Sequence, residues 1–241
     1  MDGTWNLRTA PNPLIRAAGR GLARANARHP WDHNAHFHRW ILRALPTRLD
    51  RVLDVGCGRG TLLARLAARA ERAEGIHPDP GMARAAAAAV CAIPGAQVHR
   101  RTLADHAALP GVSGAYDAVT MVASLHHQDV EQALGQARGL LRPGGRLLVV
   151  ALVRAGSPGD HLWDIANALT NPLIGLVKHP RPVREETRAR AAQAQMPVRE
   201  AGITLGELRS RAEAILPGAV IRRREGFRVT LSWQRPAAGE V

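Results

Sequence analysis

The residues best suited to chemistry lie in one glycine-rich segment, Val52-Leu-Asp-Val-Gly-Cys-Gly-Arg-Gly60. Gly56, Gly58 and Gly60 permit positive φ angles and let the backbone approach a ligand without an intervening side chain. Asp54 precedes them inside an apolar run, where a buried carboxylate needs a ligand ammonium group or the amides of the turn as partner. The segment predicts a strand, a ligand-binding turn and a helix whose first N–H groups can face an anionic group.

A second candidate group is the pair His126 and His127, which follows an apolar run over Tyr116–Val122. Sites of open parallel sheets lie at the carboxyl ends of the strands. A neutral imidazole there can take a proton from a substrate hydroxyl or amine. The pair could equally line a pocket or serve the structure alone, and the sequence leaves these alternatives open.

Four histidines near the N-terminus could suggest a metal site: His29, His33, His36 and His38. Zinc sites need three or four convergent ligands with supporting partners, and no cysteine or glutamate set accompanies these histidines. We therefore predict no metal. Phe37, Trp40, Ile41 and Leu45 recur at helical spacing, so Trp31–Leu45 is predicted as a helix, whereas the first 30 residues are expected to be loosely ordered.

The elements that must position these groups alternate between strand and helix. Strands are predicted at Arg51–Val55, Ala73–Ile76, Ala96–Arg100, Tyr116–Val122 and Arg146–Val153, and helices at Thr61–Ala70, Pro80–Cys91 and Val130–Leu141. Arg142-Pro-Gly-Gly is expected to end the last of these helices. Further helices are predicted around Leu162–Val177 and at Thr204–Leu216, followed by a tight hairpin of Ala219–Arg223 and Phe227–Trp233.

This pattern predicts an α/β fold: a Rossmann-like, seven-stranded, mostly parallel sheet closed by an antiparallel C-terminal hairpin. We divide the chain into N-terminal cap helices at 1–50, a core at 51–153, a cap insertion at 154–203, and the final helix and hairpin at 204–241. The insertion ends in an Arg/Glu-rich link.

Several motifs in order resemble the class I S-adenosylmethionine-dependent methyltransferases, in particular the branch labelled type 11. The resemblance covers about 51–153 well and 200–235 more loosely. It rests on the glycine turn, Glu74-Gly-Ile-His-Pro-Asp-Pro-Gly-Met82, Leu103-Ala-Asp-His-Ala-Ala-Leu-Pro110, Tyr116-Asp-Ala-Val-Thr-Met-Val-Ala-Ser-Leu-His-His127 and Leu140-Leu-Arg-Pro-Gly-Gly-Arg-Leu147. It implies S-adenosylmethionine as cofactor and S-adenosylhomocysteine as product.

The resemblance also implies roles for individual residues. It assigns the methionine end of the cofactor to Asp54, Gly56, Cys57, Gly58 and Gly60. His77 stands where the family has an acid for both ribose hydroxyls, and Asp79 is an alternative. For the adenine end it implies Met82 as packing partner and Asp105 as acceptor from the amino group. It further implies cofactor contacts by His106 and Val122, and by His33 and Phe37 in a lid.

Composition narrows the function. The chain has 241 residues, two cysteines and no apolar signal region, which favours a cytoplasmic protein without a disulfide framework or a membrane-inserted segment. Its net charge is +13, with basic flanks around a nearly neutral middle. Such flanks favour an anionic acceptor if they surround the site. Because nearly all basic residues are arginine in an alanine-rich chain, we expect no specific nucleic-acid binding.

We therefore expect a methyltransferase acting on a small molecule, namely a specialised metabolite, through O-, N- or C-methylation, as a monomer or homodimer. The first alternative is an RNA, peptide or protein methyltransferase. The Asn/Asp-Pro-Pro-aromatic signature of adenine methylation is absent after the fourth strand, which reads Val122-Ala-Ser-Leu-His-His127. The second alternative is a non-catalytic cofactor-binding module, suggested by His77. A dinucleotide oxidoreductase is disfavoured, because the turn does not read G-x-G-x-x-G.

Overall fold

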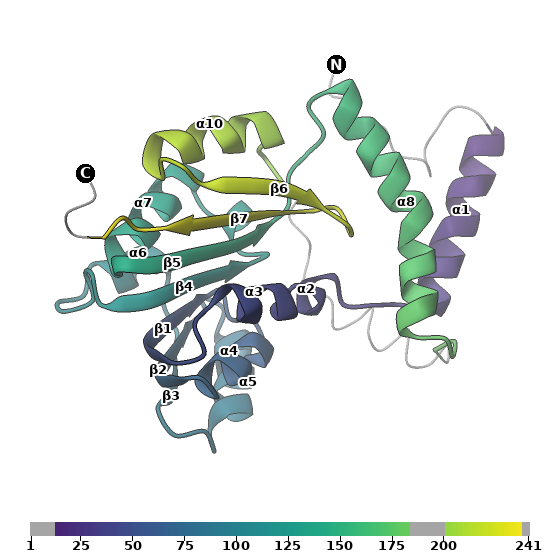
Figure 1. The fold of residues 1–241 in the computed structure, drawn as a ribbon. Coiled ribbons are helices and arrows are strands. Elements are labelled where there is room, and N and C mark those ends of the chain that lie inside the picture. The colour runs from purple at the N-terminus through teal and green to yellow at the C-terminus, as the bar shows by residue number, and fades with distance from the viewer. Residues whose placement is uncertain (1–12, 184–200, 238–241) are drawn as a thin grey trace. The chain divides into compact units, whose positions relative to one another are not determined.

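The computed structural model describes residues 13–183 and 201–237, and its central feature is a seven-stranded sheet with the order β3-β2-β1-β4-β5-β7-β6 (Figure 1). The strands are β1 Leu49–Val55, β2 Ala70–Ile76, β3 Ala96–His99, β4 Tyr116–Val122, β5 Leu141–Ala151, β6 Val220–Arg224 and β7 Arg228–Gln234. The helices include α1 Pro13–Arg28, α2 His33–His36, α3 His38–Ala44, α4 Thr61–Ala67, α5 Pro80–Val90, α6 Leu103–Ala107, α7 Val130–Leu140, α8 Pro158–Lys178 and α10 Leu205–Ile215, with a 3-10 turn η1 at Leu125–His127.

Neighbouring strands from β3 to β5 run parallel, whereas β7 is antiparallel to both β5 and β6. This arrangement confirms the predicted fold class, including the closing hairpin. In the register of the sheet, Asp54 of β1 is paired with Gly75 of β2 and with Thr120 of β4. The carboxyl ends of these three strands therefore lie at one edge of the sheet, where the glycine turn and η1 begin.

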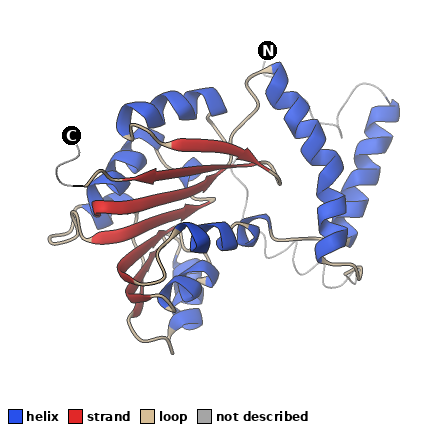
Figure 2. Ribbon diagram, in the orientation of Figure 1, coloured by secondary structure: helices blue, strands red, loops and turns tan. Residues whose placement is uncertain are grey.

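Helices cover both faces of the sheet (Figure 2). On one face, Ile41 of α3 and Leu63 and Leu66 of α4 join Val52 and Ala118 in a buried cluster. On the other face, apolar residues of α7 and α10 such as Leu134 and Leu208 join the second cluster. Alternate residues along β1, β4 and β5 supply the two clusters, which is the pattern expected when a sheet is buried on both sides.

The chain divides into two compact units. One contains residues 34–153, 201–224 and 228–241, and therefore the whole sheet except the tip of its hairpin. The other contains 1–33, 154–200 and 225–227, so it combines α1, α8 and that tip. The predicted cap at 1–50 includes residues 34–50, whereas the structure groups α3 with the sheet, because Ile41 and Leu45 belong to its core.

The unit of α1 and α8 is organised around a polar centre. The Trp31 indole N–H donates to Asn171 Oδ1 at 3.0 Å, and Asn171 Nδ2 donates to Asn26 Oδ1 at 3.1 Å. Asn167 Oδ1 accepts from the Gly226 N–H at 2.9 Å, which attaches the hairpin tip. The opposite side of α8 is exposed and apolar, with Leu169 and Leu173 more than half exposed.

Three expectations about elements were wrong. The first 30 residues include α1, although residues 1–12 lie outside the described chain. The helix predicted at Trp31–Leu45 is two short helices, α2 and α3. Strand β5 begins at Leu141 rather than Arg146, because Leu141 already pairs with Tyr116 before the register shifts. The predicted Arg/Glu-rich link falls largely on 184–200, also outside the described residues.

Candidate active site

Asp54, near the end of β1, is a carboxylic acid buried in the sheet. Only 2% of its surface is exposed. Its Oδ1 accepts a hydrogen bond of 2.8 Å from the Thr120 hydroxyl on β4. Burial raises the pKa of Asp54 to about 7, although the hydrogen bond from Thr120 acts in the opposite direction. A nearby cation would stabilise the ionised form, so this side chain suits a positively charged ligand group.

The glycine turn after β1 has the backbone that the sequence predicted. Gly56, Gly58 and Gly60 have φ angles of 72°, 55° and 80°, in the left-handed region that favours glycine. A Cβ on Gly60 would lie 3.1 Å from the backbone of Ala86, so this glycine permits close packing of α4 on α5. A Cβ on Gly58 would meet no atom within 4 Å, which leaves open space beside the turn.

Two backbone N–H groups of the turn form hydrogen bonds within the protein, and two others can donate to a ligand. The N–H groups of Gly56 and Cys57 both donate to the Ile76 carbonyl at the end of β2, at 2.8 and 3.1 Å. The N–H groups of Gly58 and Arg59 have no hydrogen-bond partner among the described residues. The open part of the turn therefore presents donors that an anionic or carbonyl group of a ligand can accept.

Ser124 attaches the end of β4 to the turn, and the sequence reasoning did not single it out. Its hydroxyl donates to the Val55 carbonyl at 2.8 Å. A Cβ on Gly56 would lie only 2.5 Å from the Ser124 Cβ, so the two segments are in close contact. Ala123, the residue before, has a φ of 52°, a conformation that side-chain-bearing residues rarely adopt. No sequence motif marks Ser124 beyond its place among small residues after a strand.

His126 and His127 follow directly in η1, and their ring centroids lie 4.0 Å apart. His77 follows β2, and burial lowers its pKa, with a smaller contribution from the charge of His127. That interaction indicates that His77 and His127 lie near each other. The structure thus brings Asp54, the glycine turn and the three histidines to the same edge of the sheet.

Asp79, Met82 and Asp105 occupy the first turns of helices. Asp79 caps α5 by accepting from the Met82 N–H at 2.8 Å, and its own N–H donates to His77 Nδ1 at 3.1 Å. Because Nδ1 accepts a hydrogen bond, the proton of a neutral His77 is on Nε2, which can donate to one ligand oxygen. Asp105 is exposed and forms a reciprocal capping box with Thr102. Met82 is half-buried.

Four other residues predicted to contact the cofactor lie at the end of β4, in the turn after β1 and around α2. Val122 is half-buried at the end of β4, and the Cys57 thiol packs against Gly75. Burial raises the pKa of Cys57 to about 12, so its thiol stays protonated. Phe37 is buried in the core beside α3 and α4, and His33 contacts Trp31 with ring centroids 4.2 Å apart.

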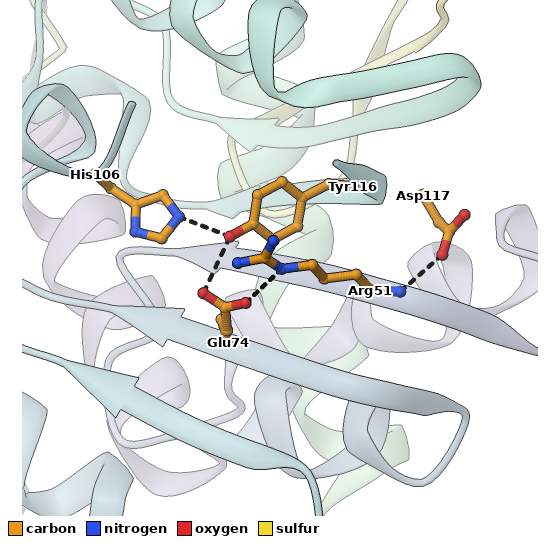
Figure 3. A network of polar contacts seen from close by, with 5 residues as sticks. All are labelled: Arg51, Glu74, His106, Tyr116 and Asp117. Carbon is orange, nitrogen blue, oxygen red and sulfur yellow. Dashed lines mark hydrogen bonds and ion pairs between the residues drawn. The ribbon is translucent and has the colours of Figure 1, made fainter. Parts of the chain in front are cut away.

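His106 is separated from the glycine turn. Its Nε2 lies 2.8 Å from the hydroxyl of Tyr116, the first residue of β4 (Figure 3). The first residues of β4 lie beside the first residues of β1, whereas Asp54 is near the opposite end. His106 is therefore bonded to the amino-terminal end of β4, away from Asp54, and we do not retain it as a cofactor ligand.

Residues 53–147 match the sequence profile of a family described as "Methyltransferase domain". An uncharacterized methyltransferase of Mycobacterium bovis is 34% identical over 212 residues, which are 86% of this chain and 98% of that protein. The chain belongs to the class I S-adenosylmethionine-dependent methyltransferases. Its cofactor is S-adenosylmethionine.

Two further similar proteins carry names that state an activity. A demethylmenaquinone methyltransferase of Thermus thermophilus is 40% identical to this methyltransferase over 120 residues, covering 46% of this chain and 53% of that protein. The structure of the N-methyltransferase NodS from Bradyrhizobium japonicum, in complex with S-adenosylhomocysteine, superposes with a TM-score of 0.50 at 15% identity, covering 90% of this chain and 97% of NodS. This structural likeness supports the fold.

The residues at the carboxyl edge of this methyltransferase fit its cofactor. S-adenosylmethionine carries an amino group, a carboxylate and ribose hydroxyls, and when bound it supplies an electrophilic methyl group on a sulfonium sulfur. Asp54 offers a buried carboxyl that lacks a cationic partner among the described residues, and Gly58 offers open space with free amides. Residues 13–183 and 201–237 contain no group of three or more side chains suited to hold a metal ion. Within the same ranges, no helix is long and apolar enough to cross a membrane.

Proposed function

We propose that this methyltransferase transfers the methyl group to a small-molecule acceptor, and that the acceptor lies against His126 and His127. The observation that carries the proposal is the position of η1. Ser124 holds the end of β4 against the glycine turn, and the two imidazoles come within the next three residues. A proton acceptor beside the methyl donor suits an acceptor atom that loses a proton as it is methylated.

The proposed chemistry assigns separate tasks to the side chains. Asp54 and the open amides of Gly58 and Arg59 bind the methionine end of the cofactor. His77 donates from Nε2 to one ribose hydroxyl, and Asp105 remains the candidate acceptor for the adenine amino group. One imidazole of η1 takes the proton from the acceptor hydroxyl or amine as the new bond to carbon forms. Alignment of the two reactants supplies most of the remaining rate enhancement.

Three observations favour a small acceptor over a nucleic acid or a protein. The segment after β4 lacks the Asn/Asp-Pro-Pro-aromatic sequence expected for adenine methylation. Methylation at cytosine C5 needs a cysteine nucleophile, and the raised pKa of Cys57 keeps its thiol unreactive. The relative from Thermus thermophilus is also named for a small-molecule acceptor, demethylmenaquinone.

A labelling experiment tests the class of acceptor. The purified protein is incubated with S-adenosylmethionine carrying a labelled methyl group and a bacterial extract, which is then separated into small-molecule, RNA and protein fractions. We expect label in the small-molecule fraction, and much less of it with a Gly56→Ala variant. Label in RNA or protein would overturn the proposal. Binding of S-adenosylhomocysteine with no label in any fraction would support the non-catalytic alternative instead.

A further inference from the structure

A cavity of about 690 Å³ lies on the sheet unit, apart from the residues assigned to methyl transfer. Its lining includes Arg51, Arg72, Glu74, His99, Arg101 and His106. The cavity extends across β1 to β3, from Arg51 in the first half of β1 to His99 at the carboxyl end of β3, where the His99 carbonyl accepts from the His77 N–H at 3.2 Å. Its volume is within the range of small-molecule sites, about 300–1,000 Å³.

The carboxylate of Glu74 is already engaged on both of its oxygens (Figure 3). Oε1 accepts from Arg51 Nε at 2.6 Å, and Oε2 accepts from the Tyr116 hydroxyl at 3.0 Å. Burial raises the pKa of Glu74, but Arg51 and Tyr116 outweigh it and hold the pKa below its usual value. Glu74 is therefore ionised and its charge is matched by Arg51, which also stacks on the Tyr116 ring at 4.5 Å.

Hydrogen bonding in the same network determines which ring nitrogen of His106 carries the proton. The Tyr116 hydroxyl donates its single proton to Glu74, so it must accept from His106 Nε2. His106 therefore carries its proton on Nε2. Its Nδ1 is buried with no hydrogen-bond partner among the described residues. Burial lowers the pKa of both His106 and His99, so neither imidazole adds a charge at neutral pH.

Two guanidinium groups of the lining form no ion pair with a carboxylate in the described ranges, although the charge of Arg101 contributes to the lowered pKa of Asp105. Neither Arg72 nor Arg101 makes an ion pair or side-chain hydrogen bond with any residue in the described ranges. Arg101 is half-buried, and its charge contributes to the lowered pKa of both neighbouring histidines. Glu71 is the other acid of the lining, and it is exposed. The cavity thus carries an excess of positive charge whose donors are uncommitted.

We propose that this cavity is a second ligand site, which binds the phosphate or carboxylate group of a small anionic ligand. Arg101 and Arg72 are the charged donors, because a guanidinium group matches the geometry of an oxyanion with two N–H groups. The neutral side chains of Gln97 and His99 provide further hydrogen-bonding capacity. The Arg51–Glu74–Tyr116–His106 network forms the fixed wall of the site.

The test is calorimetric titration of the full chain with inorganic phosphate and, separately, with citrate, at constant ionic strength. Saturating S-adenosylhomocysteine is present throughout, so that neither anion can bind at the glycine turn. Arg101→Ala and Arg72→Ala remove the proposed donors, and Arg84→Ala is the matched control, because Arg84 is an exposed arginine of α5 outside the cavity. All three arginines lack ion-pair partners in the described ranges, so their removal should leave the thermal midpoint unchanged.

We expect one of the two anions to bind the wild type and Arg84→Ala equally. Arg101→Ala should weaken that binding about tenfold, the loss expected for one charge-assisted hydrogen bond, and Arg72→Ala should weaken it as well. Binding of phosphate alone would identify a phosphorylated ligand, and binding of citrate alone a carboxylated one. The proposal is wrong if neither anion binds, or if an anion binds equally to all four proteins. Because the measurement involves no methyl transfer, its result is independent of the proposed function.

Discussion

At the scale of single residues, the contact between Gly56 and Ser124 is the feature that decides whether the turn can form. Gly56 and Gly58 share a positive φ, but only Gly56 faces a neighbour, the Ser124 Cβ at 2.5 Å from the position of an added Cβ. Backbone strain for alanine at such an angle is about 1–2 kcal/mol and applies to both positions. The steric clash applies to Gly56 alone.

We therefore predict that Gly56→Ala weakens binding of S-adenosylhomocysteine much more than Gly58→Ala does. The second substitution serves as the matched control for strain. Adding Ser124→Gly to Gly56→Ala removes the clashing Cβ and should recover part of the affinity. Isothermal titration of the wild type, Gly56→Ala, Ser124→Gly and the double variant measures this recovery as a coupling. Equal losses for Gly56→Ala and Gly58→Ala, with no recovery, would show that the contact has no role in binding.

Asp54 makes cofactor binding depend on pH. Burial raises its pKa to about 7 in the free protein, so the ionised form is poorly populated below that pH. A cationic amino group favours the ionised form. Affinity for S-adenosylhomocysteine should therefore rise as pH increases through about 7 and fall below it, with a proton released on binding at lower pH.

Titrations between pH 5.5 and 8 in buffers of different ionisation enthalpy measure both the affinity and the released proton. Asp54→Asn keeps the size of the side chain and a group that can accept from Thr120, but it cannot ionise. We expect this variant to bind more weakly at pH 8, with a flat pH profile across the range. A variant that retained the wild-type profile would assign the titration to another group.

At the scale of elements, alternation of apolar strands and helices was sufficient to predict the sheet. Capping residues indicated where helices begin. Asp79 and Pro80 mark the start of α5, and Thr204 with Glu207 forms the capping box of α10. The start of β5 was missed because Pro143 and Gly144 interrupt the strand without ending its pairing. Alpha-helix α1 was missed because its glycines and arginines obscured a helical pattern.

The candidate site could be predicted only where its residues are contiguous in the sequence and form a recognisable motif. The glycine turn and Asp54 are contiguous in sequence, so their geometry follows from the turn itself. Ser124 and Thr120 contact the turn from another strand, and nothing local marks such a pairing. The network of Arg51, Glu74 and His106 joins three elements, and only the folded sheet brings its members together.

The polar centre of α8 offers a test of stability. Asn171→Ala removes the acceptor of the buried Trp31 indole N–H and the donor to the half-buried Asn26 Oδ1, and loss of a buried hydrogen-bond partner costs about 1–3 kcal/mol. Leu173 lies two residues away on the same helix and is 61% exposed. We expect Asn171→Ala to lower the calorimetric midpoint clearly and Leu173→Ser to change it little. Similar shifts for both would contradict the hydrogen-bonded arrangement.

At the scale of the whole molecule, the net charge of +13 invites a nucleic-acid function that the site does not support. A basic surface binds phosphate backbones through counterion release, without sequence preference. We predict that any RNA or DNA association weakens steeply between 50 and 200 mM salt, values typical of such measurements, and shows no sequence selectivity. A sequence-selective footprint that persists at physiological salt would favour the RNA methyltransferase alternative.

We infer that methyl transfer occurs at the carboxyl edge of the sheet, with a histidine of η1 as proton acceptor. The decisive measurement is the turnover number of His126→Ala and His127→Ala with an acceptor found by the labelling experiment, beside His179→Ala as an exposed histidine control. We predict that one η1 variant loses roughly 10²–10⁴-fold in turnover, the range for general-base catalysis. Its affinity for S-adenosylhomocysteine should match that of the wild type, and the control should be unaffected. Full turnover in both η1 variants would rule out either histidine as the proton acceptor.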